Sequence, residues 1–172
     1  LTDADAAPLL RNGLGPLRLA PKEGPGWLFA AGQLAMTAHD LALWDIGVMD
    51  QKILKPASYR AQQTDMLLTS GLATGYGLGV DVSQMGEHRR VSHTGAVSGY
   101  TTSNQVFPED RVAIVVFTNI YPGGGGASSR IGGRIAGMLF APADTAGATA
   151  LADARAMYDE LTKGRIDRSR LT

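Results

Sequence analysis

The spacing of apolar and polar side chains along the chain predicts helices in its first part and strands in its middle. Thr37 and Asp40 resemble a capping box, with Asp in place of Glu, and Asp40 also complements the helix dipole. Apolar side chains then recur at helical spacing over residues 41–49, which predicts an amphipathic helix. Pro56 suits the first turn of a second helix, expected over about residues 57–67.

A change of period marks the middle of the chain, where side chains alternate with the period of two that strands show. Residues 85–88 and 108–111 have turn chemistry and separate the alternating runs, so neighbouring strands should be antiparallel. Residues 112–117 are apolar on both faces and are therefore expected to form a central, covered strand. The predicted strands are residues 76–82, 89–94, 101–107 and 112–119.

Glycine and proline interrupt the pattern on either side of these elements. Residues 1–26 are expected to be loop, and the glycines at 123–126 are expected to be a flexible break. Ser128 or Ser129 can cap a helix to about residue 139, whose apolar side would cover one face of the sheet. The apolar residues on that side are Ile131, Ile135, Met138 and Leu139.

The last part of the chain is expected to be a linker followed by a helix. Residues 141–149 are rich in Ala, Asp, Thr and Gly, and residues 150–163 are helical in pattern, with a stop at Gly164. The order of loop, helices, antiparallel strands and helix predicts an α+β fold, in which helices cover an antiparallel sheet.

Composition narrows the function classes. The formal net charge is zero, from 16 basic and 16 acidic side chains that are scattered along the chain. This balance gives no basis for binding nucleic acid or an anionic membrane. No apolar run is long enough for a transmembrane segment, and the absence of cysteine excludes disulfides and thiolate chemistry. Three distant histidines show no metal-binding spacing, and no cofactor is expected.

Residues 91–100 bring a histidine, serines, threonines and glycines together in one short stretch. Three interpretations of His93 stay open: a general base, an anion binder, or a histidine that is hydrogen-bonded at a strand end. Ser98 lacks the flanking glycines of a nucleophile elbow and is expected to be a turn residue. His39 and His88 are expected to be solvated.

The order of several motifs is more informative than any one of them. The motifs are, in order, Gly32-x-Leu34-x-x-Thr37-x-x-Asp40-Leu41, Tyr76-Gly77-Leu78-Gly79-Val80, His93-Thr94-Gly95, Gly99-Tyr100, and a Pro-Glu-Asp turn before the apolar strand that ends Thr118-Asn119. This succession is similar to the C-terminal part of the serine β-lactamase and penicillin-binding-protein superfamily, and class C β-lactamases, D-alanyl-D-alanine carboxypeptidases and related esterases are its nearest branch. The resemblance covers roughly residues 25–140 and implies a β-lactamase/transpeptidase-like fold without its N-terminal strands and most of its helical region.

The resemblance implies roles for four residues. In the family, Lys-Thr-Gly or His-Thr-Gly lies on a strand that lines the active site, and His93-Thr94-Gly95 matches it. By this match His93 and Ala96 are catalytic positions, with the Ala96 N–H in the oxyanion hole, while Thr94 and Gly95 bind substrate. Because imidazole is mostly neutral near pH 7, His in place of Lys favours esterase or peptidase chemistry over β-lactam hydrolysis.

The motifs that would carry the nucleophile and the proton relay are missing. None of the serines is followed three positions later by Lys, and no Tyr or Ser is followed two positions later by Asn. Thr102-Ser103-Asn104 comes closest but follows the His-Thr-Gly sequence, which is the wrong order. The chain is therefore expected to be a C-terminal portion, inactive by itself. Its expected parts are the domain portion 1–140, the linker 141–149, and a helix in 150–172 that leads toward a possible further domain.

The implied partners are a small-molecule or peptide substrate and either the missing N-terminal half or a second copy that completes the sheet. The family resemblance slightly favours a periplasmic or secreted location. Two other interpretations remain: a non-catalytic β-lactamase-like binding or regulatory module, and an unrelated α+β domain in which His93 is buried away from any cleft.

Overall fold

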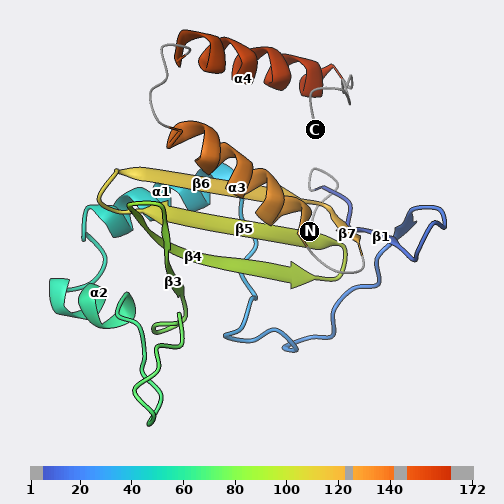
Figure 1. The fold of residues 1–172 in the computed structure, drawn as a ribbon. Helices are drawn as coiled ribbons and strands as arrows, with labels where there is room; N and C mark the ends of the chain where they lie inside the picture. Colours follow the sequence, from blue (N-terminus) through green and yellow to red (C-terminus); the bar gives the residue numbers. More distant parts are fainter. Residues whose placement is uncertain (1–5, 123–125, 142–146, 164–172) are drawn as a thin grey trace. The chain divides into compact units, whose positions relative to one another are not determined.

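The computed structural model describes residues 6–122, 126–141 and 147–163 (Figure 1). The chain divides into two compact units, Leu1–Arg134 and Ile135–Thr172. The first unit contains the sheets, the first two helices and the start of the third. Within the described residues, no helix combines the length and the apolar character that a membrane crossing needs.

A four-stranded antiparallel sheet, in the order β3-β4-β5-β6, forms the centre of the first unit. Its antiparallel hairpins confirm the predicted pairing, because the connecting turns are short. Two residues, Gly86 and Glu87, join the first pair, and the predicted turn at residues 108–111 joins the last pair. The strands are β3 (Asp81–Met85), β4 (His88–Val97), β5 (Tyr100–Phe107) and β6 (Val112–Thr118).

The prediction that residues 112–117 form a central strand was wrong. In the described chain β6 lies at one end of the four-stranded sheet, and β5 lies between two neighbours. The apolar character of β6 has another cause, because α1 (Ala38–Met49) packs against it. The strand with the most buried residues is β5, where Thr101, Ser103, Gln105, Val106 and Phe107 are buried.

Helix α1 begins as predicted. The Thr37 hydroxyl accepts a hydrogen bond from the Asp40 backbone N–H at 3.1 Å, and the Asp40 carboxylate accepts one from the Thr37 N–H at 3.2 Å. These bonds satisfy two of the free donors at the helix start. The bonds from Thr37 also lower the pKa of Asp40 below its usual value.

Helix α2 (Pro56–Gln62) begins at the predicted proline but ends five residues early. The following loop, rather than a strand, holds residues 76–80. The Gly77 N–H donates to the Val80 carbonyl at 2.8 Å, and the Leu78 N–H donates to the Gln62 carbonyl at 2.9 Å. These bonds turn the backbone back toward α2, so the predicted strand at 76–82 is wrong until Asp81.

Helix α3 (Ala127–Leu139) begins one residue before Ser128, which lies inside the helix and is buried. The residues buried along it are small and lie one turn apart: Ser128, Gly132 and Ala136. A Cβ at Gly132 would lie 2.4 Å from Gln105 Nε2, so glycine leaves room for this side chain of β5 against the helix. Ile131 is 47% exposed, so the prediction that its side of the helix covers the sheet was wrong.

Three short strands form a second sheet, and two of them lie in residues 1–26, where glycines and prolines concealed them. Its order is β2-β1-β7, with β1 (Leu9–Arg11) antiparallel to β2 (Arg18–Leu19) and parallel to β7 (Ile120–Pro122). Runs of two or three residues are too short to show a period in sequence.

The second unit contains α4 (Gly147–Thr162), which confirms the last predicted helix with an earlier start. The middle of the predicted linker, the stop at Gly164, the tail after it and most of the glycine break lie outside the described residues. The division into parts at residues 140 and 149 stays a prediction.

Candidate functional site

Strand β4, which contains the His93-Thr94-Gly95 sequence, has one free edge in its second half. Strand β3 pairs with β4 only as far as Ser92, opposite Asp81. From His93 to Val97, β4 pairs with β5 alone among the described strands. Backbone N–H and C=O groups on this side are therefore available to a ligand. His93, Thr94 and Ala96 are all exposed along this edge.

The imidazole of His93 is held by the phenol of Tyr76. The His93 Nε2 and Tyr76 Oη atoms are 2.9 Å apart, and the rings meet edge to face with centroids 6.1 Å apart. Tyr76 is fixed in turn by its backbone, whose N–H donates to the Thr74 hydroxyl and whose carbonyl accepts from the Met66 N–H. His93 is thus exposed but oriented. This excludes the interpretation in which His93 is buried away from any cleft.

A hollow of about 100 Å³ opens beside His93 on one face of the sheet. Its walls come from α1, the segment after α2, β4 and β5. Apolar side chains form part of it, including Trp44 and Val91. The polar residues that line it are Asp45, Gln62, Gln63, Ser92, His93 and Asn104.

A buried carboxylate belongs to this hollow and was missed from the sequence. Asp45 is 2% exposed, and its Oδ1 accepts a hydrogen bond from Asn104 Nδ2 at 2.9 Å. Burial raises the pKa of Asp45 to about 6, against a smaller lowering by the bond from Asn104. The sequence did contain a sign of this burial, because Asp45 falls between Leu41 and Val48 on the apolar side of the helix.

The residues of the His-Thr-Gly sequence do not point the same way. Side chains alternate along a strand, so Thr94 faces away from the side that His93 occupies. A Cβ at Gly95 would lie 2.5 Å from the Thr102 hydroxyl on the paired strand, so glycine is needed there for packing. What His93, Gly95 and Ala96 share is the free edge of β4.

Ser98 is a turn residue in the two-residue connection between β4 and β5. Its hydroxyl donates to the Glu23 carboxylate at 2.8 Å, and its N–H donates to the same oxygen at 3.0 Å. Five residues of extended strand separate it from His93, which corresponds to roughly 16 Å. His93 is therefore too far from Ser98 to act as its base.

The other two histidines lie away from this edge. His39 is exposed, as expected. The expectation for His88 was wrong, because its Nδ1 lies 2.8 Å from Asp110 Oδ1 and the pair is half-buried. Within the part of the chain that the structure describes, no three His, Asp or Glu side chains gather as metal ligands would.

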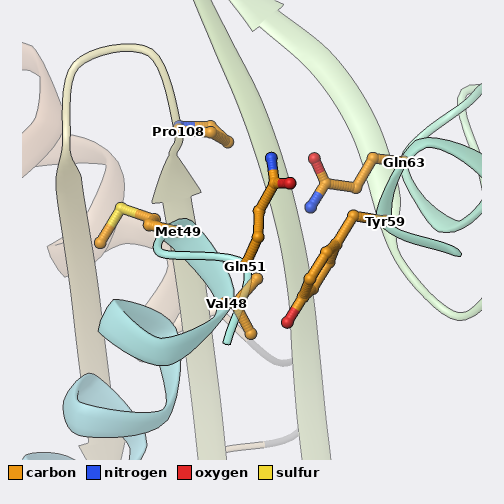
Figure 2. Close-up of a pocket in the computed structure, with 6 residues that line it drawn as sticks. All are labelled: Val48, Met49, Gln51, Tyr59, Gln63 and Pro108. Carbon is orange, nitrogen blue, oxygen red and sulfur yellow. The ribbon is translucent and has the colours of Figure 1, made fainter. Parts of the chain in front are cut away.

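A second hollow, of about 50 Å³, lies between α1, α2 and the β5–β6 turn (Figure 2). Figure 2 shows Gln51 and Gln63 with their amide groups in the same space, above the ring of Tyr59. The Tyr59 hydroxyl accepts from the N–H groups of Ile53 and Leu54, at 3.2 and 3.1 Å. This hollow has room for little more than water, and His93 does not line it.

Comparison with known proteins bears on the identity of this edge. A search of curated proteins found no match. The family model described as Beta-lactamase matches residues 3–136. This match covers most of the chain and includes every residue that lines the hollow beside His93. The predicted resemblance is confirmed at the level of the family, and the α+β fold with its antiparallel sheet agrees with it. The chain belongs to the Beta-lactamase family.

Proposed function

We propose that this chain supplies one wall of a serine hydrolase active site, in a protein that transfers and hydrolyses acyl groups through a serine ester. The observation that carries the proposal is the exposed, oriented imidazole of His93 on a strand whose edge is free from that residue onward. Family membership supports the general chemistry.

In this proposal the edge of β4 receives the substrate. The acyl group lies along residues 93–96, and the Ala96 N–H donates to the oxyanion that forms when the carbonyl is attacked. His93 and Thr94 orient the substrate from the two faces of the strand, and Tyr76 fixes the ring of His93. Gly95 leaves room for the Thr102 side chain, since a Cβ there would lie 2.5 Å from the Thr102 hydroxyl.

The substrate class follows from the presence of His rather than Lys at position 93. A Lys at this position would attract a substrate carboxylate at any pH below about 10, whereas an ordinary imidazole is mostly neutral at pH 7. We therefore favour ester or peptide substrates over β-lactams, which need that carboxylate contact.

The nucleophile in this proposal comes from polypeptide outside the 172 residues. No Ser-x-x-Lys sequence occurs among them, and Ser98 is bonded to Glu23 far along the strand from His93. The general base, a Lys in the family's Ser-x-x-Lys motif, would come from the same outside segment. The chain alone is then inactive.

The alternative is a binding or regulatory module of the same family. The observation that favours it is the same absence of Ser-x-x-Lys and of a Tyr-x-Asn or Ser-x-Asn relay. The two functions differ in whether the polypeptide that contains this chain holds a serine that becomes acylated.

Intact-mass spectrometry tests the proposal. The chain and the longest polypeptide encoded with it are each incubated with a fluorophosphonate and with a penicillin. We expect no adduct on the chain and one stoichiometric adduct on the longer polypeptide, at a serine followed three positions later by Lys. An adduct on the chain itself would contradict the proposal, and none on either polypeptide would favour the binding module.

A further inference from the structure

Two buried oxygens at the floor of the hollow have no hydrogen-bond partner among the described residues: Asp45 Oδ2 and Asn104 Oδ1. They belong to two side chains that already share one bond, from Asn104 Nδ2 to Asp45 Oδ1 at 2.9 Å. A buried acceptor without a donor costs on the order of the free energy of desolvating it. Each of the two side chains therefore has one oxygen that accepts no hydrogen bond from the described residues.

A single proton on the Asp45 carboxylate would give both unpartnered oxygens a hydrogen bond. An ionised carboxylate can only accept, so it offers nothing to the amide oxygen of Asn104. A protonated carboxyl has one donor and one acceptor side by side, and a primary amide has the complementary arrangement. With the proton on Oδ2, the Asp45 O–H donates to Asn104 Oδ1 while Asn104 Nδ2 continues to donate to Asp45 Oδ1. The two bonds close a ring.

We propose that Asp45 and Asn104 close into a cyclic acid–amide pair when Asp45 is protonated, and that Asp45 thereby sets the charge of the wall that it shares with His93. The pairing stands on the geometry of the two side chains. Only its consequence for His93 rests on the function proposed above.

The surroundings of the pair favour the neutral form. Asp45 is almost fully buried, and an ionised carboxylate without a cation in such a place is costly. Of the side chains that line the hollow, only His93 could bring a positive charge. Strand β6, which also packs against α1, carries no titratable side chain. Arg89, further along β4, directs its guanidinium to Gln63 and Glu109 instead.

The link to His93 is the strand pairing. His93 lies directly opposite Asn104 in the β4–β5 ladder, and both line the hollow with Asp45. Loss of the Asp45 proton opens the ring and places a negative charge in the wall that His93 shares. The protein then has a wall beside its substrate edge whose charge changes with pH.

The test is a pH titration followed by NMR on the full chain. The signals are the side-chain carboxyl carbon of Asp45, the side-chain amide of Asn104 and the ring of His93. We expect the Asp45 carboxyl to titrate about two pH units above an ordinary aspartate, in line with the value of about 6 against 3.8. The Asn104 amide should shift with the same midpoint. An ordinary midpoint for Asp45, or an Asn104 amide indifferent to pH, would overturn the proposal and leave water or a bound cation as the missing donor.

Asp45→Asn is the matched variant, because its amide can donate to Asn104 Oδ1 at every pH. In it the pH-dependent step at Asn104 should vanish. Asp110→Asn, which neutralises another half-buried carboxylate outside the hollow, should leave the Asp45 and Asn104 signals as in the wild type. If Asp45→Asn fails to fold, the wild-type titration still decides. If Asp45 and Asn104 titrate together as expected but the longer polypeptide has no acylated serine, only the proposed function is rejected.

Discussion

His93 and Asn104 lie opposite each other on β4 and β5, and Asn104 donates its amide hydrogen to the buried carboxylate of Asp45. An exposed imidazole and a buried acid–amide pair therefore share the walls of one hollow. This relationship joins a residue that sequence motifs identified to one that those motifs missed. Helix α1 is far from β4 in sequence, yet through Asp45 it forms part of the wall beside the free edge of β4.

Replacing His93 tests its role at that edge. In the longer polypeptide that contains the nucleophile, His93→Ala should slow acylation by an ester substrate about a hundredfold, within the range of an acid–base or orienting group. His93→Lys should raise the rate with a penicillin relative to the ester, because Lys carries a permanent charge for the carboxylate. His39→Ala, exposed and on α1, is the control. Unchanged rates in His93→Ala would remove His93 from the site.

Tyr76→Phe should release the His93 ring. The variant loses the 2.9 Å contact between Tyr76 Oη and His93 Nε2 but keeps the aromatic edge. A hydrogen bond of this kind contributes about 1 kcal/mol. We expect the ring nitrogen shifts of His93 to move toward those of a free imidazole in NMR spectra of the chain. Tyr100→Phe removes a hydroxyl bonded to the Ala6 carbonyl and should leave them in place.

Gly95→Ala should destabilise the β4–β5 hairpin by about 1–3 kcal/mol, the usual cost of an overpacked site. The new Cβ would lie 2.5 Å from the Thr102 hydroxyl. Thr102→Ala removes that hydroxyl, so the double variant should recover most of the loss in a double-mutant cycle. Unfolding is followed at one fixed protein concentration, because association would shift the apparent stability. Additive losses would show that the contact with Thr102 is not the cause.

The stability of the fold should fall as pH rises through the titration of Asp45. Its pKa is about 6 in the folded chain and 3.8 as an ordinary aspartate, so the folded state holds the extra proton between those values. The full loss above pH 6 is on the order of 3 kcal/mol at most. Asp40 and Asp50 act in the opposite sense, because hydrogen bonds and ion pairs lower their pKa values.

Comparison with Asp45→Asn isolates this contribution from the other carboxylates. The difference in unfolding free energy between the variant and the wild type should grow from pH 4 to pH 7 and then level off. A difference that stays constant across this range would mean that Asp45 does not take up its proton on folding.

Local chemistry made parts of the fold predictable. The capping box of Thr37 and Asp40 involves residues three apart, so the sequence alone defines it. The turn at residues 108–111 and the alternation in β4 and β5 are equally local. The motif at residues 93–95 could be placed on a strand for the same reason, and its exposure followed from the family resemblance.

Tertiary contacts decided what could not be predicted. The start of β3 depends on a bond from Leu78 to Gln62, which no local pattern reveals. The face of α3 toward the sheet is chosen by the closeness of Gly132 to Gln105, and this reverses the expectation from hydrophobic residues. The hydrogen-bond partner of Asp45 is Asn104 on β5, so the sequence around Asp45 could not show the pairing.

The exposed apolar residues of the first unit predict that the chain associates. Ile131 on α3 is 47% exposed and is one of many large apolar side chains that this unit leaves exposed. Apolar surface in that amount is usually covered by a partner. We expect the chain to be stable only with the rest of its domain or as an assembly of copies, and to lack a cooperative unfolding transition as a monomer. Other large apolar side chains more than half exposed include Trp27, Phe29, Leu34, Leu67, Leu72 and Leu78.

Light scattering after size-exclusion chromatography measures this directly. Ile131→Gln should reduce the mass of the assembled species or its apparent affinity, because it removes apolar area from the exposed side of α3. Arg134→Gln, exposed on the same helix, changes charge without removing apolar surface and is the control. A wild-type chain that elutes as a monomer and unfolds cooperatively, with a midpoint independent of concentration, would show that these 172 residues are complete as a folding unit. In that case the nucleophile would have to approach the free edge of β4 from a separate domain.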